Sequence, residues 1–324
     1  MEDLDMPLIE IDTFRELLTC PRCCNPLTGP IESLVCSLES CGREYPAIGE
    51  PSKPVLIDSK TSIVDVAALV KSDSASVIAR GNNGRLKEFI LHRTEARNKT
   101  AEHYARRLVE DLIAETDGRP RLLVIGGGAI GGGIEVLYKC RNIDLLAFDI
   151  YNSDNCQFLA DGHHIPLKNK SIDGVVIQAV LEHVLNPQQV VDEIYRVLRP
   201  GGLVYADTPF MWPVHEGPYD FTRFTESGHR YLFRHFAVRE SGVVSGLGTQ
   251  LLWSIVYFSR GINYRLGQIA QVVFCWLPKL DPRLDPHVTV DGASSFFFYG
   301  HSSSEIISPV EIVSYYSGAQ TLRA

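Results

Sequence analysis

Residues 121–140 read RLLVIGGGAIGGGIEVLYKC, and this stretch decides the fold. Arg121–Ile125 is a short run of apolar, mostly branched residues, which is typical of a parallel strand buried on both faces. It leads into glycine-rich residues 126–133 and then into residues 134–140, for which we predict a helix. Strand, glycine loop and helix in this order bind nucleotides, because glycines let the backbone approach a ligand and a helix N-terminus attracts negative groups. Several enzyme classes share such a loop, so by itself it does not identify the ligand.

The residues that follow narrow the range of ligands that this loop could bind. A second strand is predicted at Asp144–Phe148 and ends at Asp149, where an acidic side chain can accept both hydroxyls of a ribose. Further along come an acid, a proline, an aspartate opening a strand, the sequence LEHV and the turn LRPGG. These are Asp161, Pro166, Asp173, residues 181–184 and residues 198–202.

Over about residues 122–209 this succession resembles the core of class I S-adenosylmethionine (SAM)-dependent methyltransferases of type 11. The resemblance implies an α/β fold with a seven-stranded, mainly parallel Rossmann-like sheet and one antiparallel strand near the C-terminus. It implies SAM as cofactor, bound at the carboxyl ends of the strands. By position it assigns the methionine part to Gly126, Gly128 and Gly131, the ribose to Asp149 and Ile150, the adenine to Asp161, Gly162 and His163, and the methyl end to Gln178 and Ala179.

One position of this chain departs from the family pattern, and one histidine within the pattern has two possible roles. The family usually has an acid two residues before the first glycine, where this chain has Val124. Backbone carbonyls or an acid from elsewhere must then meet the amino group of the cofactor. The histidine of LEHV, His183, is expected to brace the loop after the fourth strand, with catalysis as the alternative.

Five of the eight cysteines lie between Cys20 and Cys41, which is a metal-site distribution. Cys20 and Cys23 form one pair and Cys36 and Cys41 a second, so two turns supply four ligands to a structural zinc ion. The segment resembles the zinc ribbon found with tRNA, rRNA and small-molecule methyltransferases, although the second pair is spaced C-x4-C instead of C-x2-C. Cys24 is an alternative ligand that we expect to point elsewhere, and a metal-free hairpin is the alternative to zinc.

An aromatic loop is predicted after the fifth strand. HEGPYDFTRFT, residues 215–225, resembles a signature of methyltransferases encoded with sugar and cell-envelope genes. His215 is the predicted general base, because an imidazole titrates near neutrality. Asp220 is a second base candidate or orients the histidine, and Arg223 either clamps an acidic group or forms a structural ion pair with Asp220. His229 is expected to face solvent or to cap a helix.

Three segments are predicted along the chain: a zinc-ribbon module at 1–60, a helical connector at 61–117 and the methyltransferase domain at 118–324. The connector carries a turn signal at 79–85 and a helix at 86–115, whose His103 or Tyr104 either covers the cofactor crevice or packs on the sheet. An apolar insertion at about 247–280 forms a lid, a homodimer face, a surface for a lipid-linked substrate or core. Final strands are expected near 238–246 and at 295–301.

The net charge of −8 argues against nucleic acid as the acceptor, because phosphate contacts favour basic surfaces. We therefore predict methylation of a small-molecule or glycosidic acceptor at oxygen. The alternatives are an RNA methyltransferase, which would carry a basic patch, and a non-catalytic scaffold. The acidic start lacks the features of a signal peptide and no stretch is apolar enough to span a membrane, so we expect a cytoplasmic protein with peripheral membrane contact at most.

Overall fold

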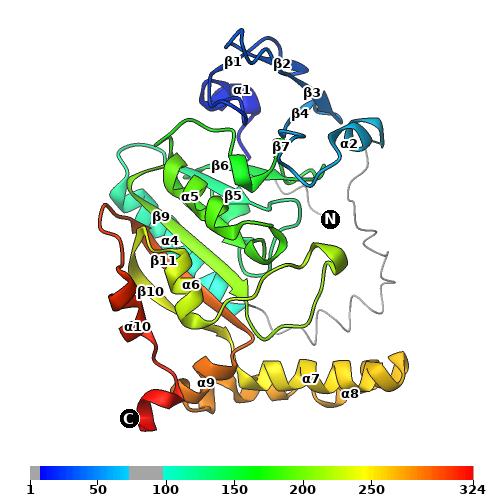
Figure 1. Ribbon diagram of the computed structural model, residues 1–324, viewed down its shortest axis with the longest axis vertical. Coiled ribbons are helices and arrows are strands. Elements are labelled where there is room, and N and C mark those ends of the chain that lie inside the picture. Colours follow the sequence, from blue (N-terminus) through cyan, green and yellow to red (C-terminus); the bar gives the residue numbers. More distant parts are fainter. Residues whose placement is uncertain (1–7, 73–97, 324) are drawn as a thin grey trace.

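A twisted sheet with helices on both faces forms the body of the molecule (Figure 1). The computed structural model describes residues 8–72 and 98–323. The strand order is β1-β2-β3-β4-β7-β6-β5-β8-β9-β11-β10. The strands are β1 Leu27–Thr28, β2 Ser33–Cys36, β3 Glu44–Ile48, β4 Lys53–Leu56, β5 Arg121–Ile125, β6 Asp144–Asp149, β7 Phe158–Ala160, β8 Ile172–Gln178, β9 Leu198–Pro209, β10 Phe236–Ser245 and β11 Ser295–Ser302.

The helices range from single turns to the seventeen residues of α4. The α-helices are α1 Ile11–Phe14, α2 Val66–Ser72, α4 Lys99–Glu115, α5 Pro187–Val197, α6 Glu226–Leu232, α7 Leu247–Ile262, α8 Tyr264–Val273, α9 Pro286–Gly292 and α10 Pro309–Tyr315. The 3₁₀ turns are η1 Arg15–Leu17, η2 Leu137–Lys139, η3 Gly162–His164, η4 Leu181–His183, η5 Gly217–Tyr219, η6 Leu277–Arg283 and η7 Ala319–Arg323.

The sheet has eleven strands, so the predicted number of seven is wrong for the sheet as a whole. β4 pairs in parallel with β7, and through it the N-terminal hairpins β1 to β3 extend the edge of the sheet. From β4 to β9 the neighbouring strands are parallel, whereas β11 runs antiparallel to β9 and β10. The predicted mainly parallel character and the antiparallel final strand are confirmed.

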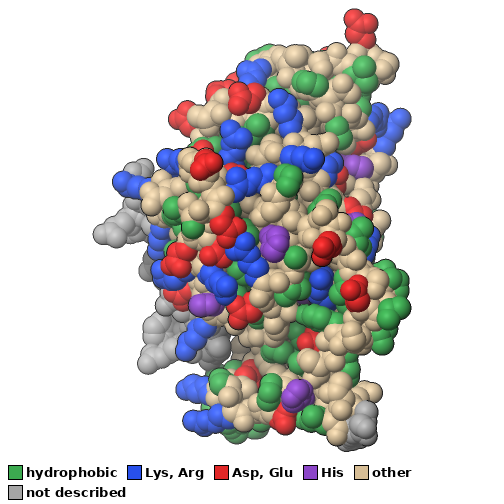
Figure 2. Space-filling view, turned by 90° about the vertical axis from the view of Figure 1, so that its left-hand side faces the viewer, with side chains coloured by type: hydrophobic (Ala, Val, Ile, Leu, Met, Phe, Trp, Pro, Cys, Tyr) green, Lys and Arg blue, Asp and Glu red, His purple; other side chains and the backbone are tan. Residues whose placement is uncertain are grey.

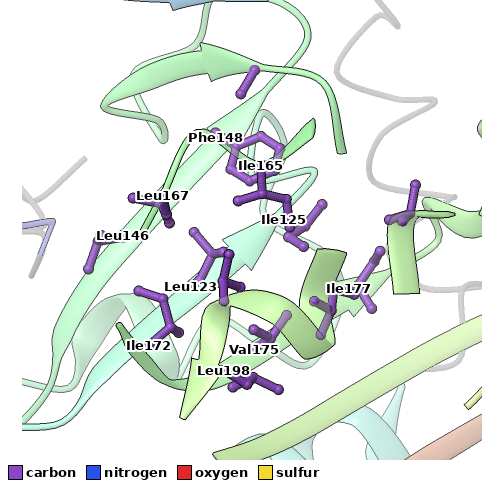
Figure 3. Close-up of a cluster of buried hydrophobic side chains, with 14 of the residues drawn as sticks. Leu123, Ile125, Leu146, Phe148, Ile165, Leu167, Ile172, Val175, Ile177 and Leu198 are labelled. Carbon is purple, nitrogen blue, oxygen red and sulfur yellow. The ribbon is translucent and has the colours of Figure 1, made fainter. Parts of the chain in front are cut away.

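Each face of the sheet buries its own apolar core, because successive side chains of a strand point to opposite faces. In β5, Leu123 and Ile125 face one core, in which α5 packs (Figure 3). Leu122 and Val124 face the other core, which α4 covers. A strand that is buried on both sides must be apolar at nearly every position, and this is why RLLVI lacks the polar alternation of a surface strand.

The N-terminal module shares the first of these cores. Leu18 bridges to Leu167, and the N–H of Thr19 donates to the carbonyl of Pro166. Leu34 and Tyr45 are buried in the same cluster as the strand residues of the main sheet. The module therefore has a larger apolar contact than its length suggests, and metal binding is not its sole source of order.

The helix predicted at residues 134–140 is not formed. This segment makes successive tight turns, in which the N–H groups of Ile134, Leu137 and Cys140 each bond a carbonyl three residues earlier. The place against the glycine loop is taken by the start of α4, since a Cβ on Gly133 would lie 2.5 Å from the carbonyl oxygen of Asn98.

α4 is the latter part of the helix predicted at 86–115, and residues 79–97, which hold the predicted turn and the first part of that helix, lie outside the described residues. Tyr104 is 5% exposed and stacks on Tyr205 in the core, so it packs on the sheet and does not cover a crevice. Its neighbour His103 is exposed.

The apolar insertion forms a hairpin of α7 and α8, which lie side by side at the end of the molecule opposite the N-terminal hairpins (Figure 1). Leu252 and Val256 are buried between the helices, while Phe258 and Ile262 are 75% and 68% exposed. Within the described ranges, no helix combines the length and apolar character needed to cross a bilayer.

Truncation of the buried face of α4 provides a stability test. Leu108 is fully buried, so Leu108→Ala should lower the free energy of unfolding by roughly 2–5 kcal/mol through lost burial and a residual cavity. Ile113 on the same helix is 43% exposed, and Ile113→Ala should change it by about 0.5 kcal/mol or less. Urea unfolding of both variants measures the difference, and equal losses would contradict the packing of α4 described here.

Candidate functional site

The glycine loop after β5 is held over β6 by two hydrogen bonds. The N–H groups of Gly126 and Gly127 both donate to the carbonyl of Phe148, at 3.1 and 3.0 Å. Gly126 has a φ of +77°, a conformation that side chains other than glycine resist. The loop thus bends sharply at the carboxyl ends of two neighbouring strands, where open parallel sheets bind ligands.

Protein side chains lie against the three glycines assigned to the cofactor. A Cβ on Gly126 would meet Val180, one on Gly128 would meet Tyr151, and one on Gly131 would meet Gln178. Close packing therefore requires glycine at these positions in this structure. A ligand entering the same place must displace Tyr151 or Gln178.

Asp149 lies where the sequence predicts it, at the end of β6 beneath the loop. Its carboxylate accepts hydrogen bonds from the N–H of Gly128 at 2.8 Å and from the N–H of Ile150 at 2.7 Å, and the residue is 8% exposed. The structure therefore brings Gly128, Asp149 and Ile150 together, with Ile150 packed on the apolar cluster around Leu159.

Asp161 begins η3 and is engaged with its own neighbours. It accepts hydrogen bonds from the backbone N–H of His163, from the ring Nδ1 of His163 at 2.6 Å and from the hydroxyl of Ser62. Burial works to raise the pKa of Asp161, but these bonds outweigh it and lower that pKa. Gly162 is buried against Val190 of α5. Ser62, Asp161 and His163 thus form a hydrogen-bonded group at the edge of the sheet beside β7. The partners of the Asp161 carboxylate in this structure are protein groups.

Gln178 and Ala179 end β8 beside the glycine loop. The side-chain amide of Gln178 donates to the carbonyl of Gly132, and its Oε1 is buried without a hydrogen-bond partner among the described residues. Ala179 has a φ of +51°, which is rare for a residue with a side chain and marks backbone strain. Such strain is common where a loop must present groups to a ligand.

A further acid, Asp207, reaches this place and was not predicted from the sequence. It accepts hydrogen bonds from the amides of Asn98 at 2.9 Å and Gln178 at 3.4 Å. Burial raises its pKa to about 7, and within the described ranges no positively charged side chain pairs with the carboxyl. An acid at the carboxyl end of an apolar strand, as in the sequence VYADTP, is the signal that could have revealed it.

Glu182, His183 and His215 form a cluster immediately after β8. The Nε2 atoms of the two histidines are 3.1 Å apart. Oε1 of Glu182 lies 3.5 Å from Nε2 of His215 and 3.6 Å from Nε2 of His183. Burial works to lower the pKa of His215, but the nearby Glu182 carboxylate outweighs it and raises that pKa. Glu182 was not singled out from the sequence, although it stands next to His183 in LEHV.

The loop around His215 is braced by an ion pair of Asp220 with Arg223, one of the two roles considered for Arg223. Arg223 donates to both oxygens of Asp220, and Asp220 also accepts the backbone N–H of His215 at 3.0 Å. Nδ1 of His183 lies 2.8 Å from the carbonyl oxygen of Tyr219, which agrees with the bracing role expected for His183. Asp220 and Arg223 thus orient the loop, and His215 has the most exposed side chain of this group, at 33%.

The expectation for His229 is wrong. The residue is 3% exposed, and its Nε2 lies 3.1 Å from the hydroxyl of Thr208. Burial lowers its pKa to about 3. The ring packs edge-on against Phe233, so the histidine belongs to the core beneath β9.

The four predicted cysteine ligands converge. The Sγ atoms of Cys20, Cys23, Cys36 and Cys41 all lie within 4.8 Å of one another. Two of the separations are 3.8 Å and 3.4 Å, and a tetrahedral site with Zn–S bonds of about 2.3 Å requires about 3.8 Å between sulfurs. Cys24 is exposed and outside the cluster, as expected.

The wider C-x4-C spacing is accommodated by a turn at its end. There the N–H groups of Cys41 and Gly42 both bond the carbonyl of Leu38. The donor set and its dimensions therefore fit a structural zinc ion.

Comparison with known proteins supports a methyltransferase fold for the central part of the chain. The family described as "Methyltransferase domain" matches residues 141–206. A probable S-adenosylmethionine-dependent methyltransferase of Mycolicibacterium smegmatis is 47% identical over 45 residues, which cover 14% of this chain and 18% of that protein. An uncharacterized 37.1 kDa protein in a Streptomyces fradiae transposon is 45% identical over 51 residues, or 16% and 15% of the two chains. The matches thus span less than a fifth of either relative.

Solved structures with similar chain paths are more distant. A SAM-dependent methyltransferase from Archaeoglobus fulgidus is 14% identical with a TM-score of 0.42, covering 66% of this chain and 99% of that one. A phosphoethanolamine N-methyltransferase from Haemonchus contortus, in complex with SAM, is 15% identical with a TM-score of 0.40 and covers 62% and 53%.

Buried His229 should make stability depend on pH. Below about pH 6.5 the unfolded chain binds a proton on this residue, whereas the folded chain does not until about pH 3. The free energy of unfolding therefore falls as the pH is lowered through this window, by about 1.4 kcal/mol per pH unit at most. In His229→Gln the loss between pH 7 and pH 5 should be smaller by about 1–2 kcal/mol, measured by urea unfolding. The same loss in both proteins would contradict a neutral buried histidine.

Proposed function

We propose that the chain is a class I SAM-dependent methyltransferase. The observation that carries the proposal is the sharp glycine loop at Gly126–Gly128 with Asp149 bonded beneath it, at the carboxyl ends of β5 and β6. The family match over residues 141–206 supports it, because this range contains β6 to most of β9. Gly126, Gly128 and Gly131 would receive the methionine part, Asp149 and Ile150 the ribose, and Asp161, Gly162 and His163 the adenine.

We assign the amino group of the cofactor to Asp207. The core residue Val124 stands where an acid is usual in the family, and Asp207 is a buried carboxyl beside Gln178, which itself touches the loop. An ammonium group would pair well with such a carboxyl, since opposite charge stabilises the ionised form of a buried acid. Gln178 and Ala179 would then lie along the methionine part of the cofactor.

The acceptor is proposed to be a small or glycosidic molecule that is methylated at oxygen. Trp212 in the loop after β9 packs on Trp253 of α7 at 5.1 Å between ring centroids, and the hydroxyl of Tyr257 donates to the carbonyl of Val214. Aromatic rings beside His215 offer flat apolar surface for a sugar or ring system. His215 would take part in activating the acceptor hydroxyl, with Asp220 and Arg223 holding the loop in place.

RNA is a less favourable acceptor on electrostatic grounds. The net charge is −8, and on the face shown in Figure 2 Lys and Arg side chains are interspersed with Asp and Glu side chains. The exposed apolar side chains of α7 and α8 suit a lipid-linked acceptor or a second copy of the chain better than they suit a polyanion.

A structural zinc ion at Cys20, Cys23, Cys36 and Cys41 belongs to the proposal. The hydroxyl of Tyr45 lies 3.1 Å from Sγ of Cys20 and can donate a hydrogen bond to a thiolate there. Four thiolates leave no coordination position open for water, so the role of the ion would be to hold the hairpins together. Thiolate ligands persist in a reducing compartment, which is consistent with a cytoplasmic protein.

Calorimetry with two ligands tests the cofactor assignment. S-adenosylhomocysteine should bind the wild type, and Asp149→Asn should weaken both it and 5′-methylthioadenosine, because both contain the ribose. Asp207→Asn should weaken S-adenosylhomocysteine by about 10–100-fold, as expected for loss of a charged hydrogen bond, and leave 5′-methylthioadenosine unchanged, because that ligand lacks the amino acid part. Wild-type protein that binds neither ligand would refute the proposal, and equal losses in Asp207→Asn would remove the role of Asp207.

Metal analysis tests the zinc assignment with neighbouring cysteines. Cys23→Ser removes a proposed ligand and should reduce the zinc held at the four cysteines by about one equivalent, whereas Cys24→Ser changes an exposed thiol outside the cluster and should retain it. The measurement is zinc per chain in purified protein by atomic emission. Retention of the same zinc content in Cys23→Ser would overturn the ligand set.

A further inference from the structure

The cluster of Glu182, His183 and His215 contains more hydrogen-bond acceptors than donors. Nδ1 of His183 faces the carbonyl oxygen of Tyr219 at 2.8 Å, and a carbonyl only accepts, so Nδ1 of this ring carries the hydrogen. Nδ1 of His215 faces the carbonyl oxygen of Pro213 at 3.3 Å and an Asp220 oxygen at 3.4 Å, so it carries a hydrogen as well. In the neutral rings both Nε2 atoms then present lone pairs to each other across 3.1 Å.

The Glu182 carboxylate adds a third acceptor to the same space. The residue is fully buried, and neither of its oxygens accepts a hydrogen bond within the described part of the chain. Buried carboxylates normally have hydrogen-bond or metal partners, because an unpaired buried charge is unfavourable. One oxygen points at the two Nε2 atoms from 3.5 and 3.6 Å. All three ligand atoms lie within 4.8 Å of one another.

We infer that Glu182, His183 and His215 bind a divalent transition-metal ion. A single shared proton would join the two histidines but would leave the carboxylate beyond short hydrogen-bond range, whereas one cation satisfies all three acceptors. Two imidazoles and one carboxylate with an open fourth position make up a common catalytic zinc set, and Mn²⁺, Fe²⁺, Co²⁺ and Ni²⁺ accept the same donors.

The surroundings are those of a metal-ligating histidine pair. Ligating histidines generally donate their second N–H to a carboxylate or backbone carbonyl, which fixes the tautomer. His183 uses the carbonyl of Tyr219 in this way, and His215 uses Pro213 and Asp220. Arg223 in turn holds Asp220 through both carboxylate oxygens. Asp220 and Arg223 are thus positioning residues for the ligand His215.

The role that we give this metal site rests on the proposed methyltransferase activity. Glu182 and His183 lie two and three residues after Val180, whose side chain packs on Gly126 of the glycine loop. A metal-bound acceptor hydroxyl has a lowered pKa and releases its proton to water. The resulting oxygen attacks the methyl carbon of SAM, so that an O–C bond forms, the S–C bond breaks and the bonding pair stays on sulfur as S-adenosylhomocysteine leaves.

Cobalt titration of the full chain tests the inference, because Co²⁺ bound by thiolates shows a charge-transfer absorption that a site with two histidines and one carboxylate lacks. After removal of bound metal, the wild type should bind two equivalents of Co²⁺, one of them without this absorption. Glu182→Gln and His183→Ala should lose that second equivalent, and Asp220→Asn should weaken it by about 10–100-fold. His103→Ala, which changes an exposed histidine on α4, should bind as the wild type does.

Wild-type protein whose bound Co²⁺ all shows the thiolate absorption would overturn the inference, as would a folded Glu182→Gln that keeps the second equivalent. Should both ligand variants fail to fold, the wild-type stoichiometry and spectrum still decide. Calorimetry with S-adenosylhomocysteine on the same sample separates the two proposals. Binding of that ligand without a second Co²⁺ would refute the metal site alone, and the reverse result would refute the methyl-donor assignment alone.

Discussion

The hydrogen bonds from Gly126 and Gly127 to the carbonyl of Phe148 are the contact on which the candidate site depends. They bend the chain at the end of β5 across the end of β6, so that the N–H of Gly128 reaches Asp149. A side chain on Gly126 would collide with Val180, and the loop could not close against the end of β8. β5 pairs in parallel with both β6 and β8, so this bend lies where the carboxyl ends of all three strands meet at one edge of the sheet.

Acidic groups accumulate at this edge in a way that a folded core normally avoids. Asp149, Asp207 and Glu182 are all buried, and each ends or follows a neighbouring strand. Backbone N–H groups compensate Asp149 and two amides compensate Asp207, whereas the Glu182 carboxylate accepts no hydrogen bond from the described residues and faces His183 and His215. A site of this charge suits cationic occupants, which a sulfonium, an ammonium group and a divalent metal ion all are.

The N-terminal hairpins are joined to this body by backbone pairing and by charge. β4 adds a parallel strand to β7, and Asp58 just beyond it accepts hydrogen bonds from Arg22 and Arg43 of the cysteine-bearing turns. These bonds lower the pKa of Asp58 against the effect of its burial. The cysteine cluster therefore lies on a platform that the main sheet supports, and the apolar contact of Leu18 and Leu34 with the main core makes the module continuous with it.

The sequence by itself determined the features that local patterns encode. The apolar run of β5, the acid at the end of β6 and the paired cysteines follow from residue type and spacing, and the antiparallel final strand follows from the resemblance to the methyltransferase core. Tertiary structure alone decided the rest. The helix expected at 134–140 gives way to tight turns where the start of α4 fills the space. Four further strands, β1 to β4, join the sheet where β4 pairs with β7, and His229 enters the core. It also decided that Asp207 meets Gln178 and that Glu182 and His183 meet His215, because these residues lie on separate strands or loops. The spacing of residue types along the chain does not show which strand ends become neighbours, because that depends on the order in which the strands pair.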